Sequence, residues 1–115
     1  MSPLTKFFEY ESNSEKIFFS GVNIIKNRLE QNMRININET LMLYAGIIAL
    51  ELRAGKSNSE IKEIVESVLS PARVMVGVPE SLRQISFDVK IDEKPKQIIQ
   101  LEEPIPTSDY ILTQK

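Results

Sequence analysis

Cysteine and histidine are both absent from this chain of 115 residues. Without cysteine the sequence offers no disulfide framework, no thiol nucleophile and no thiolate zinc site, which is typical of proteins in a reducing compartment. Without histidine it lacks the side chain most used for proton transfer near neutral pH and the commonest ligand of transition metals. A hydrolase or metalloenzyme acting alone would therefore depend on carboxylate, lysine or serine chemistry, and the composition disfavours that class.

Long apolar runs and blocks of like charge are also missing. The 14 basic and 16 acidic residues are interspersed and give a formal charge of -2, so we expect no nucleic-acid track and no basic membrane patch. No apolar run approaches the length that spans a bilayer. The N-terminal sequence MSPLTKFFEYESNSEK lacks the charged start and the apolar core of a signal peptide. We therefore expect a soluble, cytoplasmic protein of one domain that binds neither nucleic acid nor membrane.

Groups of closely spaced carboxylates are the first candidates for a catalytic or metal-binding site. Glu60, Glu63 and Glu66 recur every three residues, a spacing that could gather them as an acid–base or metal cluster. They fall on the polar side of an amphipathic pattern, which favours a solvated helix face. The pair Glu102-Glu103, after a predicted strand, is interpreted in the same way.

Two further patterns are weighed against structural explanations. The sequence RAGKS, residues 53–57, shares Gly-Lys-Ser with phosphate-binding loops but lacks their first glycine and preceding strand, so a helix end explains it better. Met33, Met42 and Met75 are interpreted as core filler. We accordingly predict no catalytic, cofactor-binding or metal-binding residue on this chain.

Apolar residues with helical spacing dominate the first two thirds of the sequence. Three helices are predicted: one from a cap at Ser12 to about Asn32, one over Glu39–Arg53 capped by Asn38, and one from a cap at Ser57 to Leu69. Ser12 with Glu15, and Ser57 with Glu60, have the spacing of capping boxes. Gly55 suits the left-handed residue that ends the second helix.

The second helix is apolar around most of its circumference. From Leu41 to Leu52 only Glu51 is charged, and such a helix must be covered on several sides. Either it is the central helix of the domain or another subunit covers one face. The sequence leaves both explanations open.

The stretch MVGVPE, residues 75–80, separates the helical part from an extended part. We expect Gly77 to take a positive φ that ends a short helical turn begun at Ser70-Pro71, and Pro79 to prevent the helix from resuming. Val78, which precedes proline, is expected to be extended.

Alternating apolar residues then predict two strands, with Ile85 to Ile91 in the first and Ile99 and Leu101 in the second. The fold class is α+β: a bundle of three to four helices followed by a C-terminal antiparallel β-hairpin. We divide the chain into an N-terminal arm over residues 1–12, a domain over 13–105 and a C-terminal tail over 106–115. The aromatic residues of the arm are expected to pack either on a neighbouring chain or on the chain's own domain.

Several short motifs stand in a fixed order along the chain: RININE at 34–39, RAGKS at 53–57, and VMVGVPE at 74–80 following Val68-Leu69. From about Ile17 to Ile105 the chain resembles the gamma subunit of urease. That family has a basic residue, leucine and asparagine before Tyr-Pro-Glu, then Arg-Asp-Gly-Lys-Ser, then Val-Met-Glu-Gly-Val-Pro-Glu after Val-Leu at the same spacing. Its Asn-Pro-Ile after the hairpin fits Glu103-Pro104-Ile105.

The resemblance implies a small non-catalytic subunit that assembles with urease alpha and beta subunits and with further gamma copies around a threefold axis. The complex would hydrolyse urea to ammonia and carbamate at a nickel site held by the alpha subunit, so this chain would hold no cofactor. Some positions depart from the family pattern: Asn38 replaces a proline, Val76 a glutamate, and Leu50-Glu51-Leu52 stands where Glu-Gly-Ala is usual. The aliphatic replacements among them, Val76 especially, motivate an alternative, a gamma-like protein that acts as a stand-alone interaction module or homo-oligomer without urease activity.

Overall fold

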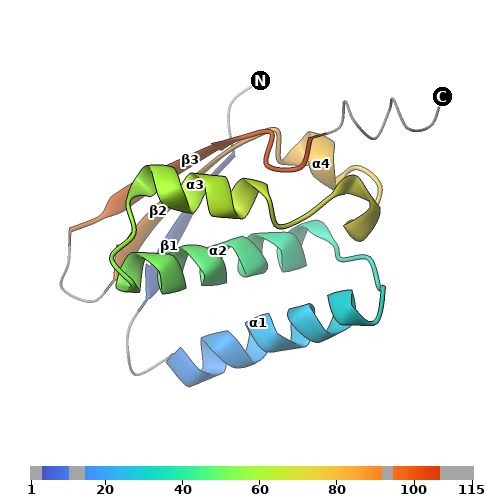
Figure 1. Ribbon diagram of the computed structural model, residues 1–115, viewed down its shortest axis with the longest axis horizontal. Helices are drawn as coiled ribbons and strands as arrows, with labels where there is room; N and C mark the ends of the chain where they lie inside the picture. The colour runs from blue at the N-terminus through green and yellow to red at the C-terminus, as the bar shows by residue number, and fades with distance from the viewer. Residues whose placement is uncertain (1–3, 11–14, 92–94, 107–115) are drawn as a thin grey trace.

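The computed structural model describes residues 4–10, 15–91 and 95–106 of the chain (Figure 1). Its elements are, in order, β1 (Leu4–Tyr10), α1 (Glu15–Glu30), α2 (Ile37–Arg53), α3 (Asn58–Glu66), the 3-10 turn η2 (Pro71–Arg73), α4 (Val78–Ser81), β2 (Gln84–Ile91) and β3 (Gln97–Glu102). The predicted α+β class is confirmed, with the helices before an antiparallel pair of strands.

Helix α2 is the central helix of the domain. It contacts α1, α3 and strand β2 (Figure 1). Its fully buried side chains include Leu43, Tyr44 and Ile48 at 2% exposure or less. Of the two explanations for its apolar circumference, coverage by the same chain therefore accounts for most of the helix. Met42 and Leu50 are the large apolar side chains of α2 that stay well exposed.

The sheet has three strands in the order β1-β2-β3. Strands β2 and β3 pair antiparallel, with Phe87 opposite Ile99, and bury one face against the helices. The buried side chains of this hairpin alternate along each strand, as predicted: Ile85, Phe87, Val89, Ile91, Ile99 and Leu101.

Strand β1 was not predicted from the sequence. It pairs parallel with β2 over seven residues, from Leu4 beside Ile85 to Tyr10 beside Ile91. Most of the predicted arm is thus part of the chain's own sheet. A parallel partner that distant in sequence leaves no local signal, because no hairpin turn joins the two strands. The division at residues 12 and 13 stays a prediction, and residues 107–115 of the predicted tail lie outside the described residues.

The cap of α2 differs from the prediction by two residues. Asn36, not Asn38, has the extended backbone of a cap, and its side chain accepts the N–H of Glu39. Asn38 is already inside the helix. Both asparagines precede the apolar run, but only Asn36 stands three residues before a glutamate, which completes a capping box. The predicted Ser57–Glu60 capping box is confirmed, whereas Ser12 lies outside the described residues.

Gly77 takes the positive φ predicted for it, at 92°. The expectation for the next residues was wrong: Val78 and Pro79 are the first residues of the one-turn helix α4, and the extended chain begins only at Gln84. Proline is tolerated in the first turn because the N–H it lacks has no acceptor within the helix. Gly77 therefore stands at the N-terminal cap of α4, and Leu82, at the C-terminal cap of the same helix, is fully buried.

Candidate functional site

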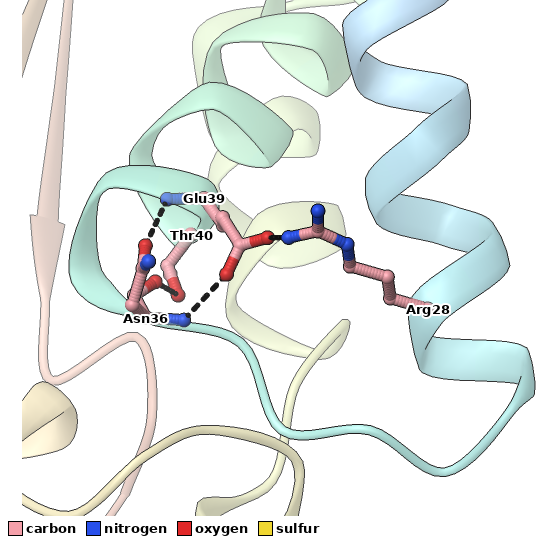
Figure 2. A network of polar contacts seen from close by, with 4 residues as sticks. All are labelled: Arg28, Asn36, Glu39 and Thr40. Atoms are coloured by element: carbon pink, nitrogen blue, oxygen red, sulfur yellow. Dashed lines mark hydrogen bonds and ion pairs between the residues drawn. The ribbon is translucent and has the colours of Figure 1, made fainter.

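The connection between α1 and α2 is held by a polar network at the start of α2 (Figure 2). The backbone N–H of Asn36 donates to a carboxylate oxygen of Glu39 at 3.0 Å, and the Glu39 N–H donates to the Asn36 side-chain oxygen at 2.8 Å. The hydroxyl of Thr40 donates to the Asn36 carbonyl at 2.8 Å. The second carboxylate oxygen of Glu39 accepts from the guanidinium of Arg28 on α1, so one carboxylate caps α2 and joins it to the preceding helix.

A second connection, from α3 to α4, lies against the first. The Ile35 N–H donates to the Arg73 carbonyl at 3.2 Å and the Met75 N–H donates to the Ile35 carbonyl at 2.9 Å. The guanidinium of Arg73 also donates to the Leu29 carbonyl at 2.6 Å, at the end of α1. The side chains of Ile35 and Val74 enter the core. Both connections are thus fixed at one end of the helical layer.

This end of the molecule exposes apolar side chains. Met33, Met75 and Val76, which we call the connection surface, are 49%, 46% and 95% exposed. A hollow of about 70 Å³ beside them is lined in part by Arg34, Met75 and Val76. The volume is too small for a metabolite, since ligand pockets hold several hundred Å³. An exposed apolar group of this kind is more typical of a protein contact.

The interpretation of the methionines as core filler was wrong for all three. Met33 and Met75 belong to the connection surface, and Met42 is 41% exposed on α2. Helical spacing misled the interpretation of Met42, because α2 is covered around most but not all of its circumference. Met33 and Met75 lie in connections, where spacing gives no guide to burial.

The three glutamates of α3 have separate roles. Glu60 completes the capping box. Its carboxylate accepts hydrogen bonds from the Ser57 backbone N–H, which has the larger effect, and from the Ser57 hydroxyl, and both lower the pKa of Glu60 from its ordinary 4.5. Glu63 is exposed. Glu66 accepts the backbone N–H of Glu102 at 3.3 Å and so covers one end of the outer edge of β3. Among the described residues, no three acidic side chains are gathered as metal ligands would be.

The sequence RAGKS forms the helix end that was predicted. Gly55 has a φ of 86°, its N–H donates to the Leu52 carbonyl, and the Lys56 N–H donates to the Glu51 carbonyl. This pair of bonds is the Schellman arrangement. A hollow of about 300 Å³ lies beside it, lined by Leu52, Lys56, Ser57, Val89 and Ile91 among others. Lys56 pairs with Glu51 at 3.5 Å and Ser57 caps α3, so both polar groups are already engaged.

Tyr44 was missed by the sequence reasoning. Its ring is fully buried on α2 and its hydroxyl has no hydrogen-bond partner among the described residues. Burial, with a smaller contribution from the charge of Glu66, raises the pKa of the Tyr44 phenol far above its ordinary value. The apolar pattern of α2 could have suggested burial of this tyrosine but not the lack of a partner, which depends on the surrounding elements.

The described residues thus define a small α+β domain that exposes apolar side chains and gathers no group of three metal-ligating side chains. No helix in the described part of the chain is long and apolar enough to cross a bilayer. Residues 10–105 match the family model described as the gamma subunit of urease. The chain is also 32% identical to a protein named urease subunit gamma from Halalkalibacterium halodurans, over 92 residues that cover 79% of this chain and 91% of that protein. The chain belongs to the urease gamma subunit family.

Proposed function

We propose that the chain is a non-catalytic, structural subunit of a urease complex. The family match over residues 10–105 carries this proposal, because it spans every described helix and both strands of the hairpin and leaves out only β1 before Tyr10. The lack of histidine supports it, since imidazole is a usual protein ligand of nickel and this chain has no imidazole to contribute. In the proposal an alpha subunit holds the nickel and hydrolyses urea to ammonia and carbamate in the cytoplasm.

In this proposal the chain contributes a pre-organised contact surface for other subunits. The capping network of Arg28, Asn36 and Glu39 and the backbone bonds between Ile35 and residues 73–75 fix both connections in one arrangement. Met33, Met75 and Val76 are thereby presented without a large loss of backbone freedom on association. Burial of these three apolar side chains by alpha, beta or further gamma subunits, arranged around a threefold axis, would stabilise the assembly.

Co-expression with the alpha and beta subunits from the same source tests the proposal. We expect the three chains to purify together and to hydrolyse urea. A Val76→Lys variant should lower recovery of the complex, because it places a charge in the contact. Ala54→Lys is the matched control, since it adds the same charge at an exposed position at the other end of α2.

The opposite result is equally specific. The proposal would be contradicted if the alpha and beta subunits formed an active complex without this chain, and if this chain, purified separately, did not bind to that complex. The alternative of a stand-alone module or homo-oligomer predicts that outcome.

A further inference from the structure

Strand β1 lies almost wholly outside the part of the chain that matches the family. The match begins at residue 10, and β1 spans Leu4–Tyr10. Within the matched part the sheet is the β2–β3 hairpin, and of β1 only Tyr10 falls inside the match.

Strand β1 occupies one complete edge of β2. Its parallel ladder runs from Leu4 beside Ile85 to Tyr10 beside Ile91, which is nearly the whole length of β2. An unpaired strand edge presents backbone donors and acceptors to any extended segment of another chain. At the other side of the sheet the Glu66 carboxylate covers the Glu102 N–H of β3. If β1 were absent, the β2 edge of the matched domain would be unpaired from Ile85 to Ile91, whereas one N–H at the β3 edge is already bonded.

The main contacts of β1 are with β2. The connection from β1 back to β2 passes through the whole helical layer (Figure 1), so β1 is also the strand whose pairing closes the longest loop. The pairing of β1 is therefore the one in this sheet that costs the most chain entropy to form.

We propose that the β2 edge is a binding site for a parallel strand, and that residues 4–10 are its built-in occupant, which closes the site to strands of other chains. The proposal goes beyond the structural-subunit function and does not depend on it. It follows that, while β1 is paired, a partner chain in any assembly can contact this sheet only at places other than the β2 edge.

A chain that can be cut after folding tests the proposal. A site for a specific protease is inserted between Tyr10 and Glu15, and the folded protein is cleaved. A labelled peptide of residues 1–12 should then replace the cleaved strand on the cut protein and should not bind the uncut protein. A peptide carrying Lys6→Pro and Phe7→Pro should bind at least about tenfold more weakly, because proline removes ladder donors. The peptide with both positions changed to alanine is the matched control, since it keeps every backbone N–H.

Uptake of the peptide by the uncut protein to the same extent, or no uptake by a cut protein that keeps its helical circular dichroism, would overturn the proposal. If cutting unfolds the protein, hydrogen exchange of the uncut Lys6→Pro, Phe7→Pro chain decides instead. The proposal predicts that amides of β2 facing β1 lose protection while those bonded to β3 keep it. Unchanged protection along all of β2 would contradict it.

Discussion

Two glycines at the contact between α1 and α2 should respond in opposite directions to the same substitution. A Cβ added at Gly46 would lie 2.8 Å from one methyl group of Val22 and 3.3 Å from the other. A Cβ added at Gly21 would lie 3.1 Å from the sulfur of Met42. Val22 is 1% exposed and Met42 is 41% exposed. The first contact is therefore with a stiff, enclosed side chain and the second with the movable end of an open one.

The magnitudes follow from two opposing terms. Replacing glycine by alanine within a helix stabilises it by about 1 kcal/mol. Overpacking a buried contact costs about 1–3 kcal/mol. At Gly46 the overpacking term applies, so Gly46→Ala should destabilise the chain by up to about 2 kcal/mol. At Gly21 the Met42 side chain can rotate away, so Gly21→Ala should stabilise it by about 0.5–1 kcal/mol.

Urea unfolding followed by far-ultraviolet circular dichroism measures both free energies. Repeating the Gly46→Ala change in a Val22→Ala background isolates the contact, because the two methyl groups that clash are then gone. In that background Gly46→Ala should become stabilising. Stabilisation by Gly46→Ala with Val22 intact would refute the close approach of α1 and α2 at this point.

Three further predictions concern single side chains. Asn36→Ala should destabilise the chain by about 1 kcal/mol in urea unfolding, because it removes the cap of α2, whereas Asn38→Ala at the predicted but incorrect cap should change the free energy by a few tenths of that; equal effects would contradict the capping network. Tyr44→Phe should leave the free energy of unfolding unchanged or raise it by up to about 1 kcal/mol, because it removes a buried hydroxyl with no partner, and a clear loss in the same assay would show that the hydroxyl is bonded. The Glu60 carboxyl, followed by nuclear magnetic resonance, should titrate below its ordinary pKa of 4.5, so its stabilising contribution is present above pH 4.5 and is lost as the pH falls through the folded pKa. Ser57→Ala should move the pKa of Glu60 upward, because it removes the bond from the Ser57 hydroxyl. An unchanged titration of Glu60 in that variant would contradict this contact.

Local signals were enough to predict most of the fold. The α3 capping box, the glycine that ends α2 and the alternation of β2 each depend on residues within a few positions of one another, and all three were confirmed. The motif order that indicated the urease gamma family likewise lies within one continuous stretch, residues 34–80. Errors of one or two residues, as at Asn36, arose where two similar side chains both suited the cap.

The features that the sequence did not reveal depend on distant contacts. The pairing of β1 with β2 joins two segments that are separated in the sequence by all the described helices, so neither strand indicates the other. The exposure of Met33 and Met75 follows from the way two connections lie together through the Ile35–Val74 bridge. The Tyr44 hydroxyl lacks a partner in the part of the chain that the structure describes, and this depends on every element around α2, not on α2 alone.

The central claim is that this chain supports a urease without performing its chemistry. Native mass spectrometry of the complex purified through a tag on this chain, with each subunit identified and urea hydrolysis assayed on the same sample, tests it most directly. The account predicts an active assembly that contains alpha and beta subunits together with this chain, and no hydrolysis by this chain purified alone. Urea turnover by the isolated chain, or a mass that contains this chain only, would contradict it.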